Sequence, residues 1–244
     1  IDYLKGFLME FVGTLLLTYF GCACFGGIMS DTLGRALCFG SIYASILQVF
    51  YLLDLAQINP AITLSYYIFG MFSLPMMFVY MIAQLLGSVF GAYILKVMST
   101  KNVLITIDSS DGNCCTKLKS GISVFRGFLW EFGLTCFLIL FICSFVESRN
   151  LGKLDTMPLR FGFLVIFPLT FVGMVYTGGS MNPARSFGPA VVANVWDDHW
   201  IYWLAPFSAS VITSVGYHIL LLPKDGQEPL KALIKNSGEE GGGD

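Results

Sequence analysis

The tripeptide Asn-Pro-Ala occurs twice in the chain, at 59–61 and at 182–184, and each copy opens a short apolar stretch, 59–69 and 182–192. Asparagine is a favoured helix N-cap and proline is favoured at the first helical position, so each copy predicts a helix start. Eleven residues of helix rise about 16 Å, half a bilayer, which predicts two re-entrant half-helices. Meeting head to head, they would direct two positive dipole ends at the middle of a membrane. A single copy would be only an ordinary turn before a helix.

Three charged residues stand in otherwise apolar surroundings. Arg185 follows the second Asn-Pro-Ala directly, and such an arginine is costly unless it faces a cavity. The alternative is that Arg185 lies at the membrane interface and extends its charged end to water. Glu10 and Glu131 are expected to accept N–H bonds from the two loops that lead into the half-helices, because backbone at membrane depth needs partners. A proton relay through these two carboxylates is the other reading.

An internal repeat positions these residues. Gly-Phe-Leu-Met-Glu-Phe at 6–11 recurs as Gly-Phe-Leu-Trp-Glu-Phe at 127–132. Phe-Gly at 39–40 recurs at 161–162, and the Asn-Pro-Ala copies follow in the same order at nearly the same spacing. Landmarks that keep their order and spacing indicate a duplicated half. Three spans per half would make the halves enter the membrane in opposite directions, which places a functional site at their interface near the midplane.

The composition is that of a membrane protein. Of the 244 residues, 55% are hydrophobic and 12% are charged, whereas soluble domains carry about 25% charged residues. A net charge of −2 excludes a nucleic-acid binder, and the hydrophobic content excludes a disordered chain. The chain is therefore expected to be an all-α membrane protein, with six transmembrane helices, two re-entrant half-helices and an inverted repeat. The predicted spans are 4–28, 36–53, 72–97, 122–146, 159–176 and 200–222.

A single channel-like domain is expected over 1–222, with repeat halves of about 1–98 and 121–222. A polar tail covers 223–244, and neither the connection at 98–120 nor that at 147–158 is long enough for a catalytic domain. We expect no signal peptide, because no separate apolar segment with a cleavage site precedes the first span. Since the chain begins at Ile1 rather than Met, we expect further sequence before it.

The basic residues do not settle the orientation, because seven lie on the terminal side and six on the other. The cysteines of the apolar runs are interpreted as small buried hydrophobes: Cys22, Cys24, Cys38, Cys136 and Cys143. Cys114 and Cys115, in the long polar connection, lack the neighbouring ligands that a metal site needs. We expect no metal and no cofactor.

At these motifs the sequence resembles the aquaporins, the major intrinsic proteins, over nearly its whole length. The likeness is most specific in Tyr-Thr-Gly-Gly-Ser-Met-Asn-Pro-Ala-Arg-Ser-Phe-Gly-Pro-Ala at 176–190. The continuation at 191–204 is similar to the aquaporin-8 branch and to plant tonoplast aquaporins. The resemblance implies a six-span right-handed bundle, a pore in each subunit, a homotetramer and cytoplasmic termini.

The resemblance also implies roles for particular residues. Asn59, Pro60 and Ala61, with Asn182, Pro183 and Ala184, match the two motifs whose asparagine amides donate hydrogen bonds to passing water. The selectivity filter would consist of Phe39, Thr170, Gly179 and Arg185. Counting back from Tyr176 gives Thr170, but counting forward from Gly162 gives a neighbour, because the fifth span is one residue longer. No cysteine occupies the Gly179 position, so inhibition by mercurials there is not expected.

The expected function is that of a passive channel, not an enzyme, conducting water in single file and excluding protons and ions. Thr170 and Gly179 leave more room than His and Cys would, so hydrogen peroxide and ammonia are further candidates. The first rival is a glycerol channel, against which Ser186 stands where such channels usually have Asp. The second is a structural or adhesive membrane protein with a closed pore. This second alternative is kept because residues 53–58 depart from the family pattern, with Gln57 in place of the usual His.

Overall fold

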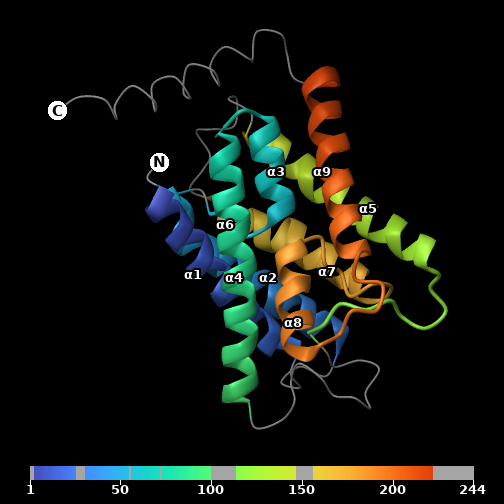
Figure 1. The fold of residues 1–244 in the computed structure, drawn as a ribbon. Coiled ribbons are helices and arrows are strands. Elements are labelled where there is room, and N and C mark those ends of the chain that lie inside the picture. Colours follow the sequence, from blue (N-terminus) through green and yellow to red (C-terminus); the bar gives the residue numbers. More distant parts are fainter. Residues whose placement is uncertain are drawn as a thin grey trace.

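The protein consists of helices joined by short connections in the parts that the computed structural model describes, namely residues 3–25, 31–54, 56–71, 73–99, 114–146 and 156–221. Figure 1 shows their arrangement as a bundle of long helices around two short ones. In chain order the elements are α1 (Tyr3–Ala23), α2 (Thr32–Asp54), α3 (Pro60–Ile68), α4 (Leu74–Met98), α5 (Val124–Val146), α6 (Met157–Arg160), η3 (Phe161–Ile166), α7 (Phe167–Met174), α8 (Pro183–Ala193) and α9 (Ile201–Leu220). The start of α1 and the end of α9 lie in the upper half of Figure 1.

The six predicted spans and the two half-helices are all present. Among the described residues, five helical segments are long and apolar enough to cross a membrane: α1, α2, α4, α5 and the continuous run of α6, η3 and α7. The sixth span is α9, with 20 residues. The half-helices α3 and α8 have 9 and 11 residues, too few to cross a bilayer. The tail at 223–244, residue 55 and the middle of the connection at 98–120 lie outside the described residues.

The two halves of the repeat interlock. In the first half α1 packs on α4, and α5 packs on α9 in the same way in the second half. Each half-helix also contacts the last span of the opposite half, α3 against α9 and α8 against α4. Ser210 of α9 donates to the Ala61 carbonyl (2.7 Å), and Ser88 of α4 donates to the Ala184 carbonyl (2.5 Å). Each half-helix is therefore fixed by a serine from the other repeat.

The fifth span contains a π-helical turn, η3, between α6 and α7. A π turn accommodates one extra residue without breaking the helix. The turn includes Gly162 and ends before Thr170. It therefore explains why counting forward from Gly162 and counting back from Tyr176 give filter positions that differ by one residue. The turn begins at the second Phe-Gly pair, where an ideal Cβ on Gly162 would lie 2.5 Å from the Gly40 carbonyl oxygen. The two Phe-Gly copies therefore meet, and glycine is needed for the backbones of α2 and η3 to approach closely.

The interpretation of Cys22, Cys24 and Cys38 as separate buried hydrophobes is wrong. Cys22 is bonded to Cys114, with Cα atoms 5.1 Å apart, and Cys24 is bonded to Cys38, with Cα atoms 5.9 Å apart. Both Cα separations lie in the usual range for disulfides. No motif in the sequence marks these pairs, whose members are 92 and 14 residues apart.

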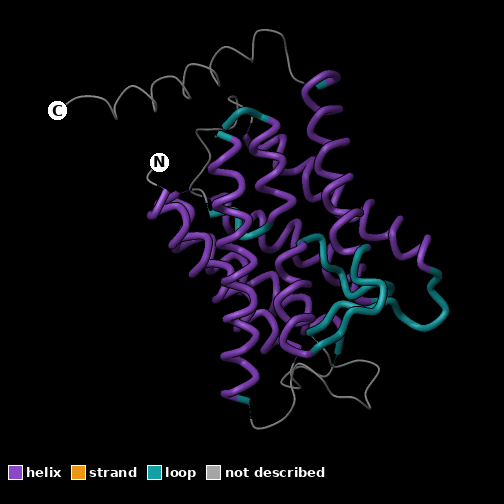
Figure 2. The backbone as a smooth tube through the Cα atoms, in the orientation of Figure 1, coloured by secondary structure: helices purple, strands orange, loops and turns teal. Residues whose placement is uncertain are grey.

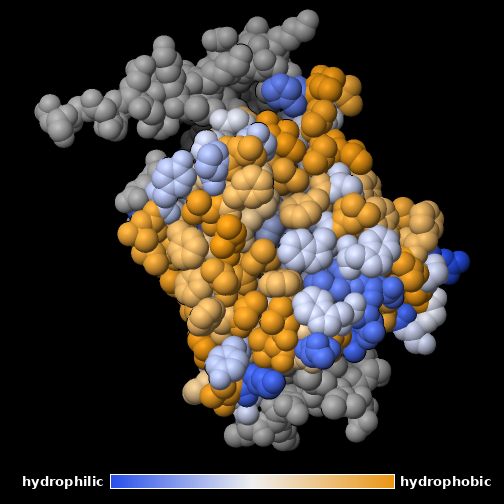
Figure 3. Space-filling model, in the orientation of Figure 1, coloured by the Kyte–Doolittle hydropathy of each residue, from blue (hydrophilic) through white to orange (hydrophobic). Residues whose placement is uncertain are grey.

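Apolar side chains cover most of the face shown in Figure 3, as lipid contact requires. A hydrophilic patch gathers over the loops that Figure 2 draws in teal at the lower right. The core between the helices is apolar as well, and it includes Leu17, Leu138 and Ile139, which are fully buried. The polar groups described next are therefore exceptions inside an apolar bundle.

Candidate functional site

The two half-helices begin in the same way. Asn59 is the N-cap of α3, and its side-chain oxygen accepts a hydrogen bond from the Ala61 N–H at 2.9 Å. Asn182 is the N-cap of α8, and its oxygen accepts from the N–H groups of Ala184 (3.0 Å) and Arg185 (3.2 Å). Proline occupies the first helical position of both helices. Because each amide oxygen is held by its own helix, each amide nitrogen must point away from that helix.

The amide nitrogens meet the opposite loop. Asn59 Nδ2 donates to the Met181 carbonyl at 3.0 Å, and Asn182 Nδ2 donates to the Ile58 carbonyl at 2.9 Å. The positive ends of α3 and α8 are thus brought together in the middle of the bundle. An amide nitrogen carries two hydrogens, and one bond is described for each. One N–H of each asparagine is therefore left to donate to a third molecule.

The backbone before each asparagine is strained in the same way. Ile58 and Met181 have positive φ angles, 46° and 52°, which are uncommon for residues other than glycine. The two carboxylates hold these segments. Glu10 accepts from the N–H groups of Gln57 (2.6 Å) and Ile58 (2.7 Å), and Glu131 accepts from those of Ser180 (2.9 Å) and Met181 (2.8 Å). These bonds fix the direction of the carbonyls that receive the asparagine amides.

Arg185 lies at the second residue after Pro183 in α8 and is 3% exposed. Its guanidinium carbon is 5.2 Å from the centre of the Phe25 ring and 5.7 Å from that of Phe39, both within cation–π range. Arg185 Nη1 donates to the Cys114 carbonyl. Within the described residues Arg185 Nε has no hydrogen-bond partner although it is buried. One edge of the guanidinium is thus anchored, and Nε is left to donate.

Thr170 and Gly179 lie against each other. A Cβ on Gly179 would be 3.1 Å from the Thr170 carbonyl oxygen and 3.3 Å from the backbone of Gly173. Gly179 also has a φ of 62°, a conformation that favours glycine. Thr170 is 1% exposed, and its hydroxyl has no partner among the described residues. The structure places Phe39 beside Arg185 and Thr170 beside Gly179, and that the two pairs form one filter stays a prediction.

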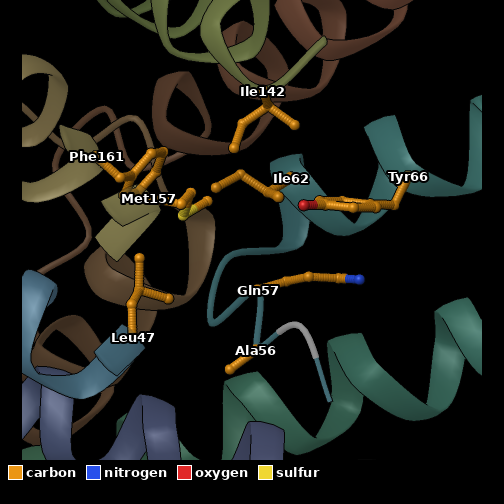
Figure 4. A pocket seen from close by; sticks show the side chains of 8 residues that line it. All are labelled: Leu47, Ala56, Gln57, Ile62, Tyr66, Ile142, Met157 and Phe161. Atoms are coloured by element: carbon orange, nitrogen blue, oxygen red, sulfur yellow. The ribbon is translucent and has the colours of Figure 1, made fainter. Parts of the chain in front are cut away.

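A small cavity lies on the α3 side of the asparagine pair (Figure 4). Gln57 and Tyr66 line one side of it, and Leu47, Met157 and Phe161 line the other. Gln57 Oε1 is buried without a partner in the described part of the chain. This residue, at the position where the resemblance predicts a histidine, thus supplies a polar group to an otherwise mostly apolar wall.

Residue-by-residue reading of the sequence missed several of these contacts. Phe25 and Cys114 contact Arg185 from the end of α1 and from the long polar connection, and no motif marks either of them. Ser88 and Ser210 hold the half-helices, and the spacing between them matches that between the repeated motifs. Extending the repeat comparison into α4 and α9 would have found this pair. Among the described residues, no group of three or more metal-ligating side chains comes together.

The comparisons with known proteins agree with this arrangement. The sequence profile described as "Major intrinsic protein" matches residues 1–217. The chain belongs to the major intrinsic protein family. Lens fiber major intrinsic protein from Canis lupus familiaris is 34% identical over 230 residues, covering 91% of this chain and 83% of that one, and the Mus musculus protein is 32% identical over 227 residues. The X-ray structure of the aquaglyceroporin from Plasmodium falciparum superposes with a TM-score of 0.80, at 24% identity, covering 91% of this chain and 98% of that one.

Membership of this family makes the chain a multi-pass integral membrane channel rather than an enzyme. The likeness to the solved structure establishes the fold alone, because the sequence identity is low. What passes through the channel therefore has to be argued from the residues of this chain.

Proposed function

We propose that the protein is a passive channel that conducts water in single file and excludes protons and ions. The observation that carries the proposal is a series of buried polar atoms without partners along the site. Within the described residues these are Gln57 Oε1, from a residue that lines the cavity, Thr170 Oγ1 and Arg185 Nε. Each asparagine amide adds a second N–H beyond the one bond that it makes. A buried polar atom without a partner costs about 1–3 kcal/mol, so each of these atoms favours a polar molecule at its position.

Water suits this series because it both donates and accepts hydrogen bonds. It loses most of its bulk partners in a narrow passage, and the wall restores some of them. At the junction, the N–H groups of Asn59 and Asn182 donate to the water oxygen, so the hydrogens of that molecule turn outward. This orientation opposes proton hopping along the file. A cation would also meet two helix N-termini and, at the filter, Arg185.

The test is stopped-flow light scattering on proteoliposomes of the purified protein. In a sucrose gradient the vesicles are expected to shrink much faster than empty liposomes, with a weaker temperature dependence because water no longer crosses lipid. A pH-sensitive dye inside the vesicles should report no added proton flux. Water permeability equal to that of empty liposomes, from correctly folded protein, would refute the proposal and favour the closed-pore structural role.

A small polyol such as glycerol is the second candidate. The observation in its favour is that Phe25 and Phe39 present apolar rings beside the donor Arg185, which suits a molecule with a carbon backbone and hydroxyl groups. Hydrogen peroxide and ammonia are smaller and would fit wherever glycerol fits. A glycerol gradient separates the cases, since rapid re-swelling of the vesicles identifies glycerol as a permeant.

The orientation and assembly are also proposals. The two disulfides tie Cys22, at the end of α1, to Cys114, and Cys24, just after α1, to α2, at the side opposite the start of α1. Disulfides persist in oxidising compartments, which supports cytoplasmic termini. Protease protection of tagged termini in sealed vesicles tests this orientation. The homotetramer expected from the family is tested by native mass spectrometry in detergent.

A further inference from the structure

The groups that hold Arg185 at the filter are attached to cysteines. Phe25 follows Cys24, and Phe39 follows Cys38, so the Cys24–Cys38 disulfide joins the backbones that carry the two rings. The carbonyl that accepts from Arg185 Nη1 is that of Cys114 itself, which is bonded to Cys22. Every contact described for the guanidinium group is thus within one residue of a disulfide.

We propose that the two disulfides position the selectivity filter, by fixing the rings and the carbonyl that hold Arg185. The inference rests on the proposed channel function and adds to it the groups that set its specificity. Each disulfide forms when two thiols lose two protons and two electrons to the thiol-oxidising system of the compartment on the side of the membrane where α1 ends.

The need for a covalent link follows from what Arg185 contacts. Two phenylalanine rings and one carbonyl make no ion pair, so the guanidinium is held by contacts that depend strongly on distance. The Phe25 ring lies just after the end of α1, the Phe39 ring belongs to α2, and the carbonyl comes from a connection far along the chain. Cys114 is fully buried and Cys22 is 1% exposed, so the link lies inside the protein next to the filter.

The connection that contains Cys114 also touches the start of α8 at a second point. Thr116 donates to the Ser186 hydroxyl at 2.8 Å, and Lys119 N–H donates to the Tyr176 carbonyl at 2.9 Å. The first bond holds the segment against α8, and the second holds it to Tyr176, which follows α7. The disulfide to Cys22 anchors its start to α1, so that the Cys114 carbonyl stays opposite Arg185.

The first experiment establishes the disulfides in the intact protein. Free thiols are blocked with N-ethylmaleimide during purification, and peptides are mapped by tandem mass spectrometry without reduction. The expected result is a Cys22–Cys114 link and a Cys24–Cys38 link. Unlinked cysteines, or a link to Cys115 in place of Cys114, would overturn the proposal. This outcome does not depend on whether the channel conducts.

The second experiment removes each link, with the paired variants C22S/C114S and C24S/C38S. The control is C136S, which removes a half-buried free cysteine on α5. Without a link Arg185 is less restrained, so the ratio of glycerol to water permeability should rise roughly tenfold, the effect of losing about one charge-assisted hydrogen bond. A variant that merely folds poorly would lose both permeabilities in proportion, and proportional loss counts against the proposal.

A third measurement is independent of transport. Phenylglyoxal modifies accessible arginines, and mass spectrometry follows the modification of Arg185 against that of Arg126, which lies on an exposed turn of α5. Arg185 should react faster in both paired variants than in the wild type and in C136S, while Arg126 reacts equally in all four. Equal Arg185 rates would overturn the proposal. A wild type that conducts neither solute refutes the channel function and leaves this readout intact.

Discussion

Replacing Glu131 with glutamine tests whether the carboxylate holds the loop before the second half-helix. Oε1 accepts from the Thr177 hydroxyl and the Ser180 N–H, and Oε2 accepts from the Met181 N–H. Glutamine has a single acceptor oxygen, so an NH2 group must face at least one donor. Glu131 is fully buried, and water cannot replace the lost acceptor.

The magnitude follows from these contacts. A hydrogen bond to a charged group contributes about 1.5–3 kcal/mol, and a buried donor left without a partner costs about 1–3 kcal/mol. We therefore expect Glu131→Gln to lower the free energy of unfolding by about 3–5 kcal/mol. At about 2–4 °C per kcal/mol for a chain of this size, the melting temperature should fall by roughly 6–20 °C. Because the loop carries Met181, which receives the Asn59 amide, water permeability should fall as well.

The assays are thermal melting by intrinsic fluorescence in detergent and osmotic shrinkage of proteoliposomes. Lys5→Gln, which removes an exposed charge from α1, is the matched control and should leave the free energy of unfolding within about 0.5 kcal/mol of the wild type. Unchanged melting and permeability in Glu131→Gln would refute the supporting role. A wild-type proton flux that disappears in Glu131→Gln would instead establish the proton-relay reading.

Three further predictions concern other parts of the molecule. Arg185→Val removes the buried cation at the filter, so the proton flux should rise roughly 10- to 100-fold in the pH-dye assay while water flux persists; an unchanged proton flux would contradict the exclusion argument. Gly162→Ala places a Cβ 2.5 Å from the Gly40 carbonyl oxygen and should cost about 1–3 kcal/mol by thermal melting, whereas Gly133→Ala, with no atom within 4 Å of the added carbon, should not. Burial lowers the pKa of His199 below its ordinary 6.5, so the folded protein keeps the ring neutral and stability should fall as pH drops below about 6.5. His199→Phe should weaken that dependence in melts taken from pH 7.5 to about 5.5, and an identical slope would exclude His199 as its source.

Much of the fold could be predicted from the chain alone because the signals are local or repeated. Uncharged runs mark the spans, since charge is costly in lipid. The Asn-Pro-Ala copies mark the half-helix starts, which the structure places at Pro60 and Pro183. The π turn could not be assigned from the sequence, because an extra residue in a helix is visible only as a disagreement between two counts.

The tertiary structure decided which residues surround Arg185. The sequence determined that an arginine follows the second half-helix start and that two glutamates occupy equivalent places, because these features belong to the repeat. It contained no sign that Phe25 and the Cys114 carbonyl contact that arginine, or that Cys22 is bonded to Cys114. Arg185 and Cys114 are 71 residues apart, and Cys22 and Cys114 are 92 residues apart. Such contacts have no period and break the symmetry of the two halves. Only the packing of α1 and of the long connection against α8 brings them together.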